Sequence, residues 1–356
     1  MQVGINYAWK NYGWDFGLPP KKNDGSSWGE RAAWQSTIDR DLARFVEVGF
    51  FCVRWFLLGD GTNYGVGVER PRLDPRGNNP WRFASPPRIS EEFLHDFERL
   101  IARFEAAGIQ LLPSLLDFHF CLPGVRVPGT DEIIKGGRRD ALLDIPGPAD
   151  PAAPPWPHQR TQFLDGVVDP LLEVAARHPR AIYAFEVMNE PEWCTQDPAR
   201  PPAIHDPSAT VPLPEMRAFV REAAARINHA GFRSTVGFSH YDTLSRWDCA
   251  GLGLTLDQFH YYGDPSVLPV NPHGPRAPTM IGELATAPHR PWPELGASQD
   301  LLSRLRLAAD KGYPTAFLWS ANRDEQSSTD PSALIAVDAS DANLALVRRY
   351  LDARYA

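Results

Sequence analysis

The sequence predicts an α/β fold, a (β/α)8 TIM barrel formed by one domain over residues 1–356. Short apolar runs alternate with amphipathic stretches along the chain, which is typical of a parallel sheet with intervening helices. Eight apolar runs occur, the number of strands that closes such a barrel. A length of 356 residues suits one barrel with extended loops, and no Gly/Ser-rich linker divides the chain.

Each element can be placed in order. We expect strands at 2–7, 50–57, 109–116, 181–188, 233–239, 255–261, 279–284 and 314–319. Helical periodicity is clearest at 36–48, 90–107, 160–177, 214–230, 298–311 and 340–354. Gly49, Gly108, Gly231 and Gly312 follow four of these stretches, as expected for glycines that cap helix C-termini.

The segments after the second, third and fourth strands are long and rich in proline. They span 59–89, 120–159 and 191–213 and contain much of the 35 Pro of the chain. Proline lowers the entropy lost when a loop becomes ordered. We therefore expect these loops to form walls of a substrate site, with a mobile lid as the alternative.

Composition excludes several classes of partner. The net charge of -8 disfavours a nucleic-acid partner, because such binding depends on clustered Lys and Arg. No apolar run approaches the roughly 20 residues of a membrane helix, so we expect no membrane association. Met1 is followed directly by an apolar strand pattern without a signal peptide, which favours a cytoplasmic location. Oligomeric state is not predicted by any of these patterns.

The four cysteines are far apart and include no CxxC pair, so neither a zinc ribbon nor a disulfide scaffold is indicated. We expect Cys52, Cys121, Cys194 and Cys249 to be free thiols. Cys121 and Cys194 each follow a strand end, so a disulfide between them is the less favoured alternative.

Two carboxylates stand out at strand ends. In such a barrel the chemistry takes place where strands run into the following loops. Glu190 directly precedes Pro191, and proline cannot continue a central strand. Glu283 lies near the end of the apolar run at 279–284. A pair of carboxylates in one cleft is the minimum needed to cleave a glycosidic bond. Each Glu alone could equally be a structural ion-pair partner, and we expect that structural role for Glu186, deeper in its strand.

Further polar residues close the other strands, and together they resemble a known family. Eight positions match in strand order: Arg54 in CVRWF, His119 in LDFHF, Asn189 and Glu190 in VMNEP, His260 and Tyr262 in FHYYG, Glu283 in MIGEL, and Trp319 in FLWSAN. This pattern resembles the clan A glycoside hydrolases, most closely the family-five cellulases, mannanases and related β-glycosidases. The resemblance covers essentially the whole chain.

The resemblance implies a retaining mechanism and a role for each matched residue. Glu190 would be the general acid/base and Glu283 the nucleophile, with Arg54 and Tyr262 keeping Glu283 ionised. By the same resemblance, Asn189 would bind the sugar 2-hydroxyl, His119 and His260 would line the site, and Trp319 would form its floor. The two carboxyl groups of a retaining enzyme lie roughly 5 to 5.5 Å apart, against roughly 6.5 to 9.5 Å in an inverting one.

Other aromatic residues are candidates for sugar stacking. We expect Trp193, three residues after Glu190, on the leaving-group side. The remaining candidates are Trp9, Tyr12, Trp14 and Trp81. His240 matches nothing in the family pattern and is a possible site-lining residue.

Other catalytic classes lack their motifs. The chain has no HxH or HExxH spacing, so we expect no metal site. It also lacks the GxSxG elbow of a serine hydrolase. Without a GxGxxG or Walker loop, no cofactor is expected either. The predicted function is hydrolysis of β-linked oligosaccharides or small β-glycosides of gluco- or manno-configuration, with exo-action or short substrates favoured. A non-catalytic carbohydrate-binding barrel and a transglycosylase remain alternatives.

Overall fold

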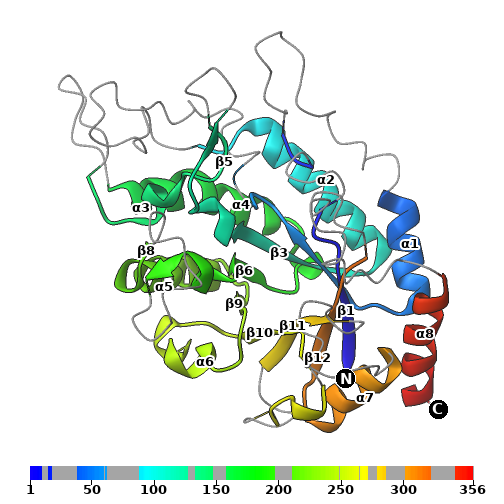
Figure 1. Ribbon diagram of the computed structural model, residues 1–356. Coiled ribbons are helices and arrows are strands. Elements are labelled where there is room, and N and C mark those ends of the chain that lie inside the picture. The colour runs from blue at the N-terminus through cyan, green and yellow to red at the C-terminus, as the bar shows by residue number, and fades with distance from the viewer. Residues whose placement is uncertain are drawn as a thin grey trace.

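The computed structural model describes residues 1–9, 15–17, 38–59, 61, 88–126, 133–146, 158–196, 211–247, 249–263, 265–271, 279–285, 301–321 and 341–355. Eight parallel strands close into a barrel, which confirms the predicted TIM barrel (Figure 1). The barrel strands are β1 (Gln2–Asn6), β2 (Cys52–Phe56), β3 (Gln110–Asp117), β6 (Phe185–Asn189), β9 (Ser234–Phe238), β10 (Asp257–Tyr261), β11 (Thr279–Ala285) and β12 (Thr315–Trp319). All eight predicted strands are present, and β1 closes the barrel by pairing with both β2 and β12.

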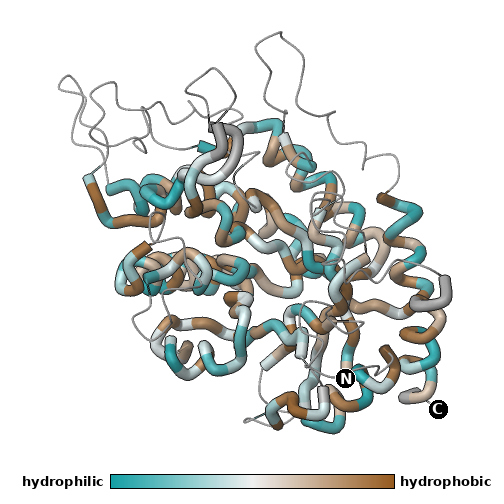
Figure 2. Tube along the Cα trace, viewed as in Figure 1, coloured by the Kyte–Doolittle hydropathy of each residue, from teal (hydrophilic) through white to brown (hydrophobic). Residues whose placement is uncertain are grey.

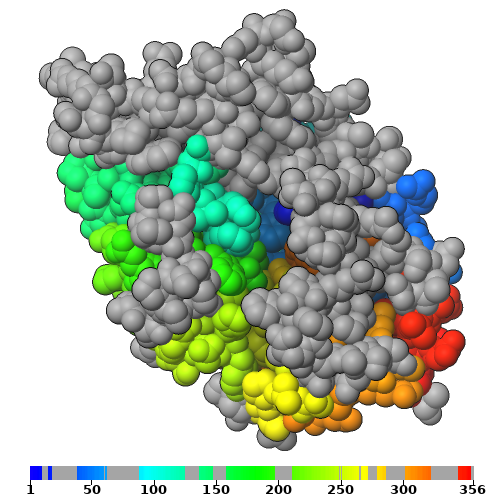
Figure 3. All heavy atoms as spheres, viewed as in Figure 1, coloured from blue at the N-terminus to red at the C-terminus, as the bar shows by residue number. Residues whose placement is uncertain are grey.

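Helices surround the barrel. They are α1 (Ile38–Val48), α2 (Glu91–Ala107), α3 (Gln159–Phe163), α4 (Asp169–Ala175), α5 (Leu213–His229), α6 (Thr243–Arg246), α7 (Leu301–Asp310) and α8 (Asp341–Tyr355). In the space-filling view α8 (red) and α7 (orange) lie on the side of the molecule opposite α5 (green) (Figure 3). None of the helices in the described part of the chain has the length and hydropathy to span a bilayer.

The outer helices are amphipathic, with apolar and polar residues alternating along each tube in Figure 2. Helix α2 buries Phe93, Phe97, Leu100, Ile101 and Phe104, all at most 2% exposed. Their spacing follows the helical period and gives one apolar face toward the barrel. Burial of each such side chain is worth about 1.5 to 3 kcal/mol.

Caps fix the ends of α2 as the sequence indicates. The Ser90 hydroxyl accepts from the Phe93 N–H at 3.2 Å, and Gly108 ends the helix in the left-handed region at φ 71°. A residue with a Cβ is disfavoured in that region. All four predicted stop glycines have positive φ.

The predicted helix over 160–177 is interrupted. Between α3 and α4 the segment η4 (Leu164–Val168) is a π-helix. Pro170 has no N–H to donate to the carbonyl of Gly166, four residues earlier, and that carbonyl instead accepts from the Ile89 N–H at 2.9 Å. Proline therefore accounts for the break, and the chain before α2 satisfies the oxygen that it leaves.

Short elements extend from the carboxyl ends of the barrel. The 3-10 turn η2 (Phe118–Phe120) follows β3, and η6 (Pro191–Cys194) follows β6. Two small sheets pair β4 (Val125–Arg126) with β5 (Ile133–Lys135) and β7 (Thr195–Gln196) with β8 (Val211–Pro212). Most of the expected loop walls at 59–89, 120–159 and 191–213, as well as Tyr12, Trp14 and Trp81, lie outside the described residues.

The barrel interior is apolar at one level and polar above it. A cluster of Cys52, Leu112, Ala184, Leu256, Met280 and Phe317 packs near the amino ends of the strands. Four polar residues, Arg54, Ser114, Glu186 and Gln258, follow two positions after members of that cluster, and alternation along a strand places them on the same interior face. The polar layer is therefore closed off from below.

Candidate active site

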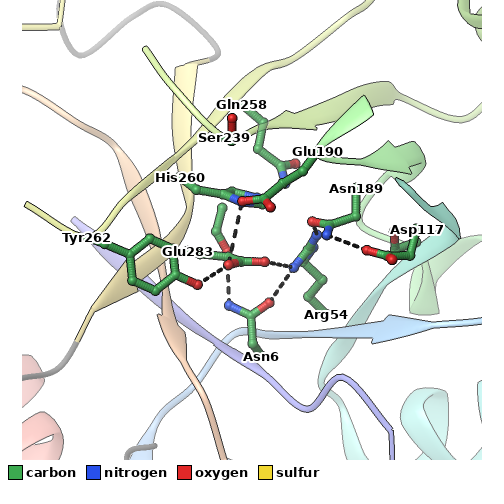
Figure 4. A network of polar contacts seen from close by, with 12 residues as sticks. Asn6, Arg54, Asp117, Asn189, Glu190, Ser239, Gln258, His260, Tyr262 and Glu283 are labelled. Atoms are coloured by element: carbon green, nitrogen blue, oxygen red, sulfur yellow. Dashed lines mark hydrogen bonds and ion pairs between the residues drawn. The ribbon is translucent and has the colours of Figure 1, made fainter. Parts of the chain in front are cut away.

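Arg54 of β2 is the centre of the polar layer, and all five of its N–H groups donate (Figure 4). Nε and Nη2 each donate to Glu186 at 2.6 Å, in a two-pronged pair. Nη1 donates to Asn6 Oδ1 at 2.8 Å and to Glu283 Oε1 at 2.7 Å. Nη2 also donates to Asn189 Oδ1 at 2.6 Å. One fully buried guanidinium thus orients residues from β1, β6 and β11.

Glu186 lies beneath the two candidate catalytic carboxylates. Besides Arg54, its oxygens accept from Ser114 Oγ at 3.0 Å and Gln258 Nε2 at 2.8 Å. The side chain is fully buried. A buried carboxylate needs such partners to remain charged, and the structural role expected for Glu186 is consistent with them.

Glu283 of β11 is held in the barrel mouth, with a side chain that is 4% exposed. Its Oε1 accepts from Arg54, and its Oε2 accepts from the Tyr262 hydroxyl. Both expected partners are therefore in contact with it. Burial nevertheless raises the pKa of the Glu283 carboxyl; His260, Arg54 and the Tyr262 hydroxyl oppose that rise, and the negative charge of Glu190 adds to it. The partners expected to favour the ionised form are present, but they do not outweigh burial.

Glu190 sits in a different environment at the end of β6. Its backbone adopts φ 45°, an uncommon conformation for a residue with a side chain, immediately before Pro191. The Glu190 N–H donates to the Gly237 carbonyl at 2.6 Å, which fixes the turn against β9. Its side chain is 17% exposed, compared with 4% for Glu283. The less buried carboxylate is thus the one expected to hold a proton, whereas the sequence predicts less polar surroundings for Glu190 than for Glu283.

His260 of β10 lies between the two carboxylates. Its Nδ1 is 2.7 Å from Glu190 Oε1 and 3.4 Å from Glu283 Oε2. One ligand atom from each of Glu190, His260 and Glu283 lies within 4.8 Å of the others, so the two carboxylates approach closely. At least one oxygen of Glu190 therefore lies within 4.8 Å of an oxygen of Glu283.

The imidazole of His260 is neutral near pH 7. Burial lowers its pKa to about 4, because the charged ring would lose its hydration, and the positive charge of Arg54 acts in the same direction. The ring therefore carries one proton, and it can either donate to an ionised Glu190 or accept from a protonated one.

Asp117 fixes the amide of Asn189. The Asn189 Nδ2 donates to Asp117 Oδ2 at 2.7 Å, while its Oδ1 accepts from Arg54. Burial raises the pKa of the Asp117 carboxyl, but contacts with His119 and Asn189 outweigh it and hold that pKa below its usual value. His119 bonds Asp117 through its backbone N–H and through Nδ1, and its ring is 54% exposed. The candidate sugar-binding amide thus has a single orientation.

Trp193 in η6 contacts the candidate acid/base directly. Its indole Nε1 donates to Glu190 Oε2 at 2.9 Å. The ring centroid lies 6.3 Å from Phe118 and 6.5 Å from His240, whose side chain is at the surface beside it. Trp319 is half-buried at the end of β12, opposite Ala285 of β11. Trp9 packs on Phe56 at 5.5 Å.

Sequence reasoning missed Asn6 and Gln258, and it placed Asp117 at a strand end on the catalytic face without assigning it a role. Asn6 donates to the Gly282 carbonyl at 2.9 Å and the Leu318 carbonyl at 3.1 Å, and it accepts from Arg54. Gln258 bonds Glu186, and Asp117 orients Asn189. The available signal was a polar side chain inside an apolar strand, as for Asn6 and Gln258, or directly at a strand end, as for Asp117.

The fold is similar to those of solved glycoside hydrolase structures. The sequence matches no protein-family model, and no curated protein matches it. Among solved structures, a β-mannanase from the blue mussel Mytilus edulis superposes with a TM-score of 0.61 at 19% identity, covering 99% of this chain and 92% of that one. An endo-1,4-β-mannanase from Eisenia fetida gives 0.63 at 18% identity, with 98% and 90% covered.

A further neighbour was solved with a bound sugar. The GH5_18 enzyme of Streptomyces cattleya, in complex with Manβ1-4GlcNAc, gives a TM-score of 0.55 at 13% identity, covering 99% of this chain and 80% of that one. Identities this low establish the fold alone. The chain therefore has the TIM-barrel fold of the β-mannanases and GH5_18 enzymes over almost its whole length.

Proposed function

We propose that this protein is a retaining β-glycosidase of the family-five type, with Glu190 as acid/base and Glu283 as nucleophile. The observation that carries the proposal is the convergence of these two carboxylates, with one oxygen of each within 4.8 Å of the other, beside a buried arginine network. The contacts of Glu283 with Arg54 and Tyr262 support its role as the nucleophile, because both partners favour the ionised carboxylate.

In the first step, the Glu283 carboxylate attacks the anomeric carbon and the glycosidic C–O bond breaks. The proton of Glu190 goes to the departing oxygen. In the second step Glu190 takes a proton from water, the resulting hydroxide attacks the same carbon, and the bond to Glu283 breaks. Glu190 is ionised between the steps.

The raised pKa of Glu283 bears on the pH dependence. The nucleophile must be ionised to attack, so activity should be lost on acidification through a pKa above the ordinary value for glutamate, about 4.3. Arg54 limits that rise because its charge favours the ionised form.

We propose β-mannosides as the substrates to test first, with β-glucosides next. The structural neighbours include β-mannanases and an enzyme bound to Manβ1-4GlcNAc, and this supports a mannose unit on the glycone side. Asn189 supports recognition near the anomeric carbon, because its amide is fixed by Arg54 and Asp117 and its Nδ2 carries a second hydrogen.

The test is hydrolysis of aryl β-mannosides, β-glucosides, β-galactosides and β-xylosides, with proton NMR to identify the anomer released first. We expect turnover of one or two glycosides with retention of configuration. Glu283→Ala should abolish it. Glu190→Ala should keep activity only on activated leaving groups and form a β-glycosyl azide when azide is added. Glu173→Gln, at an exposed position on α4, should retain full activity.

Other outcomes would contradict the proposal. Release of the opposite anomer would show an inverting enzyme. Sugar binding by calorimetry without turnover of any glycoside would indicate a non-catalytic barrel. Transfer of the glycone to an added sugar in preference to water would identify a transglycosylase.

A further inference from the structure

The turn that follows Glu190 binds its carboxylate as well as its backbone. In η6 the Trp193 N–H donates to the Glu190 carbonyl at 3.1 Å, and the indole Nε1 donates to Glu190 Oε2 at 2.9 Å. The sequence places Trp193 among the candidate sugar platforms. The structure gives its nitrogen a second use, because the indole contacts the proposed acid/base itself.

The two oxygens of Glu190 have chemically different partners. Oε1 is 2.7 Å from Nδ1 of His260, an atom that can donate or accept. Oε2 faces an indole N–H, which can only donate. Oε2 therefore accepts from the indole in both protonation states of Glu190. The carbonyl-type oxygen is the better acceptor, so this contact favours the exchangeable proton on Oε1, beside an atom that can accept it.

We propose that Trp193 is a positioning residue for the acid/base: its indole N–H assigns the transferable proton to Glu190 Oε1 and favours the ionised form needed between the two steps. This inference rests on the proposed function for its catalytic meaning. The contact itself exists without that function, so the two can fail separately.

Hydrogen bonds within η6 and to β9 hold the indole of Trp193 in place. Fully buried Glu192 accepts from the Ser239 N–H at 2.7 Å and from Ser239 Oγ at 3.0 Å, which fixes η6 to the end of β9. Thr195 Oγ1 donates to the Pro191 carbonyl at 2.7 Å. The ring also lies between Phe118 and His240. Such support keeps the N–H directed at the carboxylate.

Several charged or titratable groups face Glu190 from other elements. They are His260 on β10, Tyr262 after β10 and Glu283 on β11, which is itself paired with Arg54 on β2. His260 approaches both carboxylates, so changing it alters both groups. Trp193 carries no charge and bonds Glu190, so removal of its N–H is a more selective change.

A role in stacking alone makes a different prediction. Trp193→Phe keeps an aromatic face and removes the N–H, whereas Trp193→Ala removes both. If the indole only stacks on the leaving group, Trp193→Phe should resemble wild type. If the N–H acts on Glu190, both variants should show the same change in proton affinity, and loss of stacking should add a higher KM in Trp193→Ala.

The experiment is a carboxyl carbon-13 NMR titration of protein labelled at glutamate, with the Glu190 signal identified by its absence in Glu190→Gln. We expect the apparent pKa of Glu190 to rise by about one unit in both Trp193 variants, since a donor to the charged form is removed. The pKa that governs the alkaline side of the pH profile of kcat/KM should rise by the same amount. Trp55→Phe is the matched control, because it removes an indole N–H from the carboxylate of Asp15, at 3.0 Å, and should leave the Glu190 signal unchanged.

An unchanged or lowered pKa in the Trp193→Phe variant would overturn the proposal, and Trp193→Ala gives the same readout if the first variant does not fold. A shifted pKa in a protein without hydrolytic activity would support stabilisation of ionised Glu190 by Trp193 and reject the glycosidase function. An unshifted pKa in an active enzyme would do the reverse.

Discussion

At the scale of single residues, the site is governed by one positive charge shared among carboxylates. Arg54 pairs with both Glu186 and Glu283 in a layer closed to solvent. Since Glu186 takes two of its five donors, Arg54 only partly compensates Glu283, and the pKa of the nucleophile candidate stays raised by burial. The same burial, with the charge of Arg54, keeps His260 neutral.

Removal of this cation should therefore destabilise the fold. Arg54→Met leaves two buried carboxylates without their partner, so we expect a loss of about 3 to 5 kcal/mol in the free energy of unfolding. Urea denaturation at pH 7 measures it. The loss should shrink at pH 5, where the Glu283 carboxyl, whose pKa is raised, can protonate. Arg54→Lys keeps the charge and should lose less stability, but its point charge cannot replace the five-donor geometry. Equal stability of Arg54→Met and wild type would contradict this account.

His260 predicts a pH dependence of stability. Its pKa is about 4 in the folded protein, against about 6.5 when unfolded, so between these values the unfolded chain binds the extra proton. Stability should therefore fall as the pH drops from about 6.5 to about 4. The expected loss is about 3 kcal/mol.

His260→Asn cannot take up this proton and should lose correspondingly less stability on acidification. Urea unfolding of both proteins at pH 7 and pH 4.5 measures the difference. Parallel pH dependences would show that the histidine is not buried as a neutral ring.

At the scale of elements, the sequence indicates strands well because each is a short apolar run with a defined end. Glu190 and Glu283 could be located because a proline or a strand terminus determines their position. The hydrogen bonds that join Asn6, Gln258 and Asp117 to the site could not be predicted from the sequence. The register between strands that are far apart in the sequence decides which polar groups meet. The π-helical segment before Pro170 was not predicted for a related reason. The Gly166 carbonyl there accepts a hydrogen bond from Ile89, which is distant in the sequence.

Strand β9 supports the site through the absence of a side chain. A Cβ at Gly237 would lie 2.9 Å from Gln258 Nε2, Glu186 Oε1 and His260 Nε2. Gly237→Ala should therefore displace the network, with a cost of about 1 to 3 kcal/mol in stability and at least tenfold in kcat/KM on whichever glycoside is turned over.

Gly231→Ala is the matched control for this prediction. That glycine has φ +87° and no atom within 4 Å of an added Cβ. The variant should lose about 1 to 2 kcal/mol from backbone strain and keep its activity. Similar kcat/KM losses in the two variants, measured with thermal unfolding, would show that crowding of the site is not the cause.

At the scale of the whole molecule, the polar network lies directly on an apolar cluster inside the barrel, so we expect the site and the core to unfold together. The four cysteines lie in different parts of the fold, and all are at most 5% exposed. They are Cys52 in β2, Cys121 after η2, Cys194 in η6 and Cys249 outside the barrel. All four are free thiols, as the sequence predicts. Burial raises the pKa of Cys52 and Cys194 well above the ordinary value, which further suppresses the reactive thiolate.

Thiol labelling therefore tests whether the barrel unfolds as one unit. Native protein should react slowly with a chromogenic disulfide reagent, and the denatured chain should release four equivalents, because each sulfur is shielded by folded structure. Across a urea titration, all four should become reactive at the midpoint seen by circular dichroism, as a two-state transition requires. A count of two would show that one disulfide is present, contrary to the four free thiols of the structure. Reaction of Cys249 at lower urea than Cys52 would show that the outer layer opens before the barrel.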